Sequence, residues 1–156
     1  MANSMGDQNL ELDTNESEIQ IESSYKVITY PASQLPQSFL NVIIAPFMNS
    51  LRYGNDMFKL IDKQAFYRAY KIYIDMLLSR PESVIKMALL NDDTVLGWSL
   101  FENKTLHYIW VKKEVRRQGI GKSLLPKEFD KISHITNKGL NIWVSKFPEV
   151  RFDPFA

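Results

Sequence analysis

The residues best suited to chemistry lie between a predicted strand and a predicted helix, where positions 111–125 read VKKEVRRQGIGKSLL. Gly119 and Gly121 stand at the expected start of the helix, where about four backbone N–H groups have no intrahelical partner. Those donors and the positive end of the helix dipole suit a phosphate, and glycine lets an anion approach the backbone. We therefore predict a pyrophosphate site at this junction.

The side chains around the two glycines strengthen this prediction. Arg116, Arg117 and Lys122 add positive charge, and Ser123 adds a hydroxyl donor. Two nucleotide-binding motifs do not match: the loop Gly-x4-Gly-Lys-Ser/Thr would need glycine at position 116, and Gly-x-Gly-x-x-Gly fails at Leu124. The site is therefore neither of these two nucleotide loops.

The pattern that matches is Arg/Gln-x-x-Gly-x-Gly/Ala, present as RRQGIG at 116–121, after a strand ending in Ile109-Trp110-Val111. In this respect the chain resembles the GNAT superfamily of acetyl-coenzyme A dependent N-acetyltransferases. A predicted hairpin with Leu96-Gly97-Trp98 in its second strand is similar to that family's second and third strands. The resemblance covers the chain from Tyr25 to about Ser145.

The resemblance implies that acetyl-CoA is the cosubstrate and that backbone groups bind it. The backbone of Ile109 and Val111 would pair with the pantetheine arm as if with an added strand. The acetyl carbonyl would lie near the Val111 N–H, an oxyanion donor worth roughly 3 kcal/mol. Arg116 and Arg117 would flank the pyrophosphate, which would be held by N–H groups of Gln118, Gly119, Ile120, Gly121, Lys122 and Ser123.

Acid and base groups are harder to assign. The family's usual thiolate acid is a tyrosine on a helix near the C-terminal end, and here no tyrosine follows Tyr108. The nearest titratable residues are Tyr108, His107 and Glu114. His107 and Tyr108 are neighbours on a predicted strand and face opposite sides of it, so at most one reaches an acceptor cleft. Each residue also has a competing interpretation. His107 can be a satisfied surface or core residue, Tyr108 can pack in the core, and Glu114 can be a solvated loop residue paired with a neighbouring Lys or Arg.

The surrounding pattern predicts an α/β (α+β) fold, with a mixed, mostly antiparallel sheet flanked by helices. Strands are expected at 25–30, 84–90, 94–101, 105–111 and 140–144, with Asn91-Asp92-Asp93 as a hairpin loop. A first helix is expected over 35–51, kinked or split at Pro46. A second begins after Asp62 and ends near Ser79, with a buried stripe of Phe66, Ala69, Tyr70, Tyr73, Met76 and Leu77.

Two features shorten the C-terminal half. Pro126 falls inside the helix expected from Gly119, so that helix should be short or broken after the phosphate-binding turn. Residues 146–156 are too few for the family's further helix and two closing strands, so the C-terminal part is expected to be abbreviated.

Composition sets the remaining limits. Residues 1–24 contain six of the 18 acidic residues and none of the 19 basic ones, so residues 25–156 carry a net charge of +7. We expect a disordered acidic tail at 1–24 and one domain at 25–156. The absence of cysteine excludes disulfides, thiolate metal sites and a cysteine nucleophile. The two histidines, His107 and His134, argue against a multi-histidine metal site. No apolar run is long enough for a membrane helix, and a cytoplasmic location fits.

Three functions remain open. The first is acetyl transfer from acetyl-CoA to an amine of an unknown small molecule or protein. The second is a catalytically inactive GNAT-fold structural or interaction module, favoured by the abbreviated C-terminal part, Pro126 and the missing tyrosine. The ending Phe152-Asp153-Pro154 resembles acetyltransferase-like proteins of tailed bacteriophages, so such a module could be a virion component, and a homodimer is a further partner expectation. The third and weakest is nucleic-acid binding by residues 112–131, which contain seven basic and three acidic residues.

Overall fold

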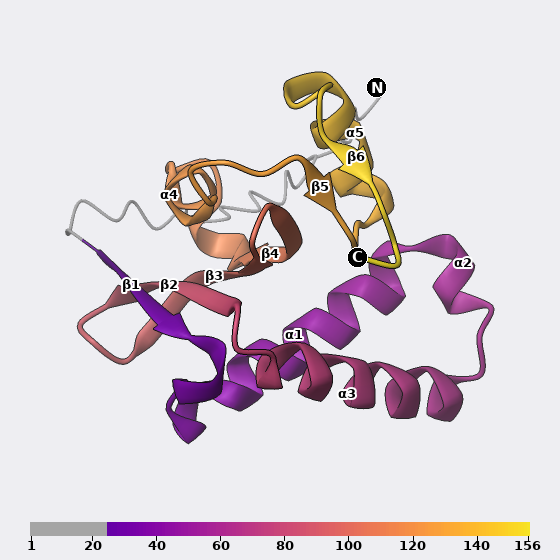
Figure 1. The fold of residues 1–156 in the computed structure, drawn as a ribbon, viewed down its shortest axis with the longest axis horizontal. Helices are drawn as coiled ribbons and strands as arrows, with labels where there is room; N and C mark the ends of the chain where they lie inside the picture. Colours follow the sequence, from indigo (N-terminus) through magenta and orange to yellow (C-terminus); the bar gives the residue numbers. More distant parts are fainter. Residues whose placement is uncertain (1–24) are drawn as a thin grey trace, which may run out of the picture.

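Six strands form a mixed sheet in the order β1-β2-β3-β4-β5-β6 in the computed structural model, which describes residues 25–156 (Figure 1). β1 to β4 are antiparallel neighbours, whereas β5 runs parallel to β4 and β6 runs parallel to β5. The predicted acidic tail, 1–24, lies outside the described residues. The strands are β1 (Lys26–Pro31), β2 (Ser83–Leu90), β3 (Thr94–Glu102), β4 (Thr105–Val111), β5 (Lys131–Ile132) and β6 (Arg151–Phe152).

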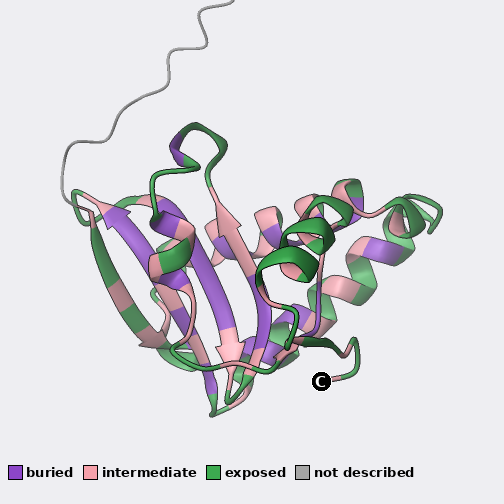
Figure 2. Ribbon diagram, turned by 90° about the horizontal axis from the view of Figure 1, so that it is seen from above, coloured by how far each residue is buried: buried purple, intermediate pink, exposed green. Residues whose placement is uncertain are grey.

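Helices cover both faces of this sheet. α1 (Gln37–Gly54) and α3 (Lys63–Ser79) lie on one face and α4 (Ile120–Leu124) on the other (Figure 1). Each face has its own buried cluster, and Figure 2 shows the central strands largely buried between them. The remaining elements are α2 (Asp56–Lys59), α5 (Asn137–Lys146) and the 3-10 turns η1 (Ala32–Gln34) and η2 (Lys113–Val115). The predicted fold class is confirmed. No helix within residues 25–156 has the length and apolar character needed to cross a membrane.

α1 runs through Pro46 as one continuous helix, so the predicted split is wrong. Proline has no N–H to offer the carbonyl of Val42, four residues earlier. That carbonyl instead accepts a hydrogen bond from the fully buried indole N–H of Trp98 on β3, at 3.2 Å. Pro46 thus leaves the Val42 carbonyl free to accept the hydrogen bond of the buried Trp98 indole. This bond connects helix α1 to strand β3.

α3 begins and ends where the sequence predicts. The Asp62 carboxylate accepts a hydrogen bond from the Ala65 N–H at 2.8 Å, and the helix ends at Ser79, two residues before Pro81. The predicted stripe is partly wrong, because Ala69 and Met76 are exposed. The buried positions of α3 are Phe66, Ile74, Leu77 and Leu78.

The predicted strand at 140–144 is wrong, because these residues lie in helix α5. The Thr136 hydroxyl accepts a hydrogen bond from the Gly139 N–H at 3.0 Å and so caps the helix. Trp143 packs against Phe147 with ring centroids 4.7 Å apart, while the alternating apolar residues of 140–144 are exposed. The C-terminal part is short as expected: β5 and β6 contain two residues each.

Candidate functional site

The sheet opens between β4 and β5. The two strands pair only at Thr105 with Lys131 and at Leu106 with Ile132. On its other edge β4 pairs Leu106 with Phe101 but Tyr108 with Leu100, so His107 is an extra residue, a β-bulge. Beyond this bulge, the part of β4 up to Val111 has no neighbouring strand on the β5 side among the described residues. The result is a free strand edge between the two strands.

The backbone groups on this free edge can be assigned from the ladder. The Lys112 N–H donates to the Leu96 carbonyl of β3 at 2.9 Å, so Lys112 faces β3. Because strand residues alternate, the backbone groups of Val111 and Ile109 face the free edge. The Arg116 Nε–H donates to the Val111 carbonyl at 3.0 Å, which agrees with that direction. Both residues predicted to pair with a pantetheine arm are thus oriented toward the opening.

The predicted pyrophosphate loop lies at the start of α4, on the face opposite α1 and α3. Gly119 is the N-cap, with φ of 83° and no side-chain cap, and Arg117 also has a positive φ of 65°. Ile120 is buried at 1% exposure and fixes the turn to the sheet. Its neighbours Arg116, Arg117, Gln118, Gly119 and Lys122 are exposed.

One predicted donor of this loop is already used. The Ser123 N–H donates to the Gly119 carbonyl at 3.2 Å, as a normal helical bond. The Ser123 hydroxyl donates to the Ile120 carbonyl at 2.8 Å and lies 3.3 Å from the Tyr25 hydroxyl. The backbone donors that α4 leaves without intrahelical partners are therefore those that precede Ser123.

The three predicted acid or base residues are not brought together. Tyr108 is buried and stacks on Phe47 with centroids 4.5 Å apart, and burial raises the pKa of its hydroxyl. The Ser50 hydroxyl donates to the Pro46 carbonyl, so Tyr108 is the donor in its 2.6 Å contact with Ser50. Glu114 is exposed on η2. His107 is fully buried in a different hydrogen-bond network.

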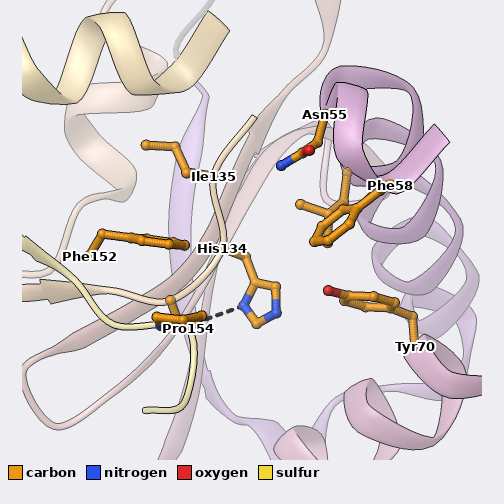
Figure 3. A pocket seen from close by; sticks show the side chains of 9 residues that line it. Asn55, Phe58, Tyr70, His134, Ile135, Phe152 and Pro154 are labelled. Carbon is orange, nitrogen blue, oxygen red and sulfur yellow. Dashed lines mark hydrogen bonds between the residues drawn. The ribbon is translucent and has the colours of Figure 1, made fainter. Parts of the chain in front are cut away.

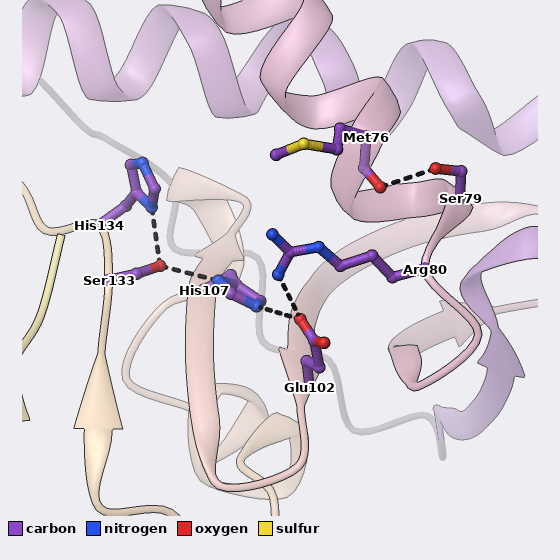
Figure 4. A network of polar contacts seen from close by, with 7 residues as sticks. All are labelled: Met76, Ser79, Arg80, Glu102, His107, Ser133 and His134. Carbon is purple, nitrogen blue, oxygen red and sulfur yellow. Dashed lines mark hydrogen bonds and ion pairs between the residues drawn. The ribbon is translucent and has the colours of Figure 1, made fainter. Parts of the chain in front are cut away.

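That network is a chain of side chains that the sequence analysis did not assign (Figure 4). Arg80 bonds the Glu102 carboxylate at 2.7 Å, and the same Oε2 atom lies 3.3 Å from His107 Nε2. His107 Nδ1 lies 2.8 Å from the Ser133 hydroxyl, which in turn lies 2.8 Å from His134 Nδ1. The chain runs from the rim of the sheet to the residues that follow β5.

A cavity of about 70 Å³ lies at the His134 end of the chain, between β5 and the helices (Figure 3). Its polar lining groups come from Asn55, Ser133, His134 and the hydroxyl of Tyr70, which points toward His134 in Figure 3. The other lining residues are apolar or aromatic: Leu51, Phe58, Ile135, Phe152 and Pro154. Among residues 25–156, no carboxylate or cationic side chain lines it.

Burial sets the protonation of this region. It lowers the pKa of His134 to about 4, with a smaller contribution from His107. Burial also lowers the pKa of His107, although Glu102 opposes this effect. Burial would raise the pKa of Glu102, but hydrogen bonds from Arg80 and His107 lower it overall. At neutral pH both imidazoles are therefore uncharged and Glu102 is ionised.

Comparison with known proteins identifies the fold. No protein-family model matches the sequence, and no curated protein matches it. Among solved structures, a candidate acetyl transferase from Pyrococcus furiosus is similar, with a TM-score of 0.59 and 19% identity over 82% of this chain and 95% of that chain. A candidate GNAT-family acetyltransferase from Staphylococcus aureus gives a TM-score of 0.43 and 13% identity over 81% of this chain and 97% of its own. The fold is that of the GNAT acetyltransferases.

Proposed function

We propose that this protein is an N-acetyltransferase that transfers the acetyl group of acetyl-CoA to an amine. The observation that carries this proposal is the free β4 edge beside the start of α4, in a GNAT fold. A strand edge can bind an extended, amide-containing chain through backbone hydrogen bonds, and the pantetheine arm is such a chain. The exposed N–H groups and cations at the start of α4 would bind the pyrophosphate.

The direction of the arm follows from the position of α4. A Cβ atom added at Gly121 would lie 3.8 Å from Val111 Cγ2, so the proposed phosphate site adjoins the Val111 end of β4. An arm that starts there and follows the free edge passes Ile109 and reaches the bulge at His107. The Val111 N–H would then contact the arm near the phosphates, so this proposal replaces the expectation that it is the oxyanion donor to the acetyl carbonyl. The thioester would lie close to the point where β4 meets β5.

The test uses Gly121, the second residue of α4. Glu at this position favours the helix through its dipole but places a carboxylate beside the phosphates. We expect acetyl-CoA at millimolar concentration to raise the melting temperature of the wild-type protein and Gly121→Glu to abolish that rise without lowering the unliganded melting temperature. Gly121→Gln, of the same size without charge, should lose part of the shift by blocking the approach to the backbone, and less of it than Gly121→Glu.

Two results would contradict the proposal. The first is a wild-type melting temperature that acetyl-CoA does not change. The second is an equal shift in Gly121→Glu and wild type, which would place the coenzyme elsewhere.

A further inference from the structure

The hydrogen atoms of the buried chain have one consistent arrangement at neutral pH. The ionised Glu102 carboxylate only accepts, so His107 Nε2 carries a hydrogen and, in a neutral ring, Nδ1 is an acceptor. The Ser133 hydroxyl must then donate to His107 Nδ1. Its single hydrogen is used, so His134 Nδ1 must donate to Ser133. The lone pair of His134 is therefore on Nε2.

His134 Nε2 takes no part in the hydrogen-bond network and is the ring nitrogen available to the cavity. His134 lines the cavity, and Figure 3 shows its ring between Pro154 and Tyr70. Nδ1 is the ring atom bound to Ser133, so Nε2 is the atom left to meet a ligand. A lone pair in an apolar cavity favours a ligand that brings an N–H or O–H donor.

The residues that line the cavity also restrict the charge and polarity of the rest of the ligand. A polycation such as spermidine would find no counter-ion in the cavity among residues 25–156, because none of the lining residues there is a carboxylate. Glu102 lies at the far end of the hydrogen-bond network, beyond Ser133 and His107, and it already binds Arg80 at 2.7 Å. Phe58, Tyr70 and Phe152 instead offer aromatic surface to an apolar substituent.

The cavity adjoins the opening in the sheet. The Ser133 N–H bonds the Leu106 carbonyl of β4 at 3.1 Å, directly before the bulge. The His134 ring meets the edge of Phe47 at a centroid distance of 5.6 Å, and Phe47 stacks on Tyr108 of β4. A thioester carried along the free edge to the bulge would thus arrive beside His134.

We propose that this cavity binds the acceptor as an apolar monoamine and that His134 Nε2 accepts the hydrogen of its reacting N–H. This assignment rests on the proposed function. The lone pair of the neutral amine attacks the thioester carbon, forming the C–N bond, and the nitrogen gives its proton to Nε2. The C–S bond breaks with its electron pair on sulfur, and the thiolate takes a proton from solvent. As the product leaves, the imidazolium releases the added proton from Nε2 to solvent, which restores the starting tautomer, while its Nδ1–H stays bonded to Ser133 and, through His107, to the ionised Glu102.

The first arm of the test does not depend on acetyl transfer. NMR of the protein labelled with 15N-histidine should show His134 protonated at Nδ1 and unprotonated at Nε2 at neutral pH. Titration with benzylamine, a neutral-capable apolar monoamine, should shift the Nε2 resonance, whereas spermidine should not. A protonated Nε2, or no response to benzylamine, would overturn the assignment.

The second arm measures turnover with acetyl-CoA. Benzylamine should exceed spermidine in kcat/KM by at least about tenfold. His134→Asn keeps a donor near Ser133 but removes Nε2, so its rate should fall by about 100-fold while the acetyl-CoA thermal shift remains. Tyr67→Phe, which removes a hydroxyl bonded to Asn49 on the exposed side of α3, should keep the wild-type rate.

The two proposals fail in different ways. If acetyl-CoA does not bind, the proposed function is wrong. The NMR measurement of the His134 tautomer and the benzylamine titration still test the cavity assignment in that case. If acetyl-CoA binds and is consumed but His134→Asn keeps the wild-type rate, or spermidine is the better acceptor, the cavity assignment is wrong and the proposed function stands.

Discussion

The two faces of the sheet hold their polar groups in opposite ways. On the α4 face, Arg117 and Lys122 are exposed to water. On the α1 and α3 face, His134 packs against Phe47, Tyr70 and Tyr73. It is bonded through Ser133 to His107, and all three members of this network are buried. Exposed cations can take up and release a highly charged ligand in water, whereas buried neutral groups can hold one specific hydrogen-bond direction. The α4 face is therefore suited to binding a charged ligand, and the buried network is suited to moving one proton.

The largest expected effect that tests this contrast is acid destabilisation through His134. Its pKa is about 4 in the folded protein against 6.5 for the free side chain, so below pH 6.5 the unfolded state binds the proton first. The contribution of neutral His134 to the free energy of unfolding is fully present above pH 6.5. It falls by about 3 kcal/mol as the pH drops toward 4. His107, with Glu102 and Arg80 beside it, adds to the loss in the same direction. Urea unfolding between about pH 7.5 and about pH 4.5 would measure it.

The matched variant is His134→Asn, which does not titrate in this range. Between about pH 7.5 and about pH 4.5, the variant should lose less free energy of unfolding than the wild type, and the difference should be about the 3 kcal/mol assigned to His134. If wild type and variant show parallel curves, His134 is charged or accessible in the folded protein. The contrast between the two faces would then be wrong.

The sequence predicts the α4 face better than the other because its features are local. Gly119 as N-cap and the helix end before Pro126 both follow from neighbouring residues and are confirmed. The pairing of His107 with Ser133, 26 residues away, depends instead on the parallel contact of β4 with β5, which has no local signal. The place of His134 in this hydrogen-bond network therefore could not be predicted from the sequence.

The errors in element type have a similar origin. The alternation of Leu140, Ile142 and Val144 is typical of a half-buried strand, but short apolar runs do not distinguish a strand from a helix. The Thr136 cap and the packing of Trp143 on Phe147 favour the helix here. In α1, Pro46 was expected to kink or split the helix, and the helix is continuous; the carbonyl that Pro46 leaves without its helical donor is bonded by Trp98, which is distant in the sequence.

A smaller effect should appear where α4 meets the sheet. A Cβ atom at Gly97 would lie 2.8 Å from the Trp110 carbonyl and 3.0 Å from Leu124 Cδ1, so Gly97→Ala should lower the free energy of unfolding by about 2 kcal/mol. At Gly121 the nearest atom to an added Cβ is 3.8 Å away, and alanine favours a helix. Gly121→Ala should therefore leave stability equal or slightly higher by urea unfolding. Equal losses in both variants would show that α4 does not pack tightly on β3.

The smallest effect on stability should come from the exposed charge itself. Lys122 is exposed on α4, so Lys122→Gln should change the free energy of unfolding by less than about 0.5 kcal/mol. The same variant should weaken acetyl-CoA binding about threefold at low salt, and the difference should shrink as salt screens the phosphates. Lys104→Gln removes the same charge at the opposite end of β4, in the turn before Thr105, and should leave binding unchanged. Isothermal titration at two salt concentrations would compare them. If both variants weaken binding equally, the coenzyme responds to total charge, and the exposed cations of α4 do not form a localised site.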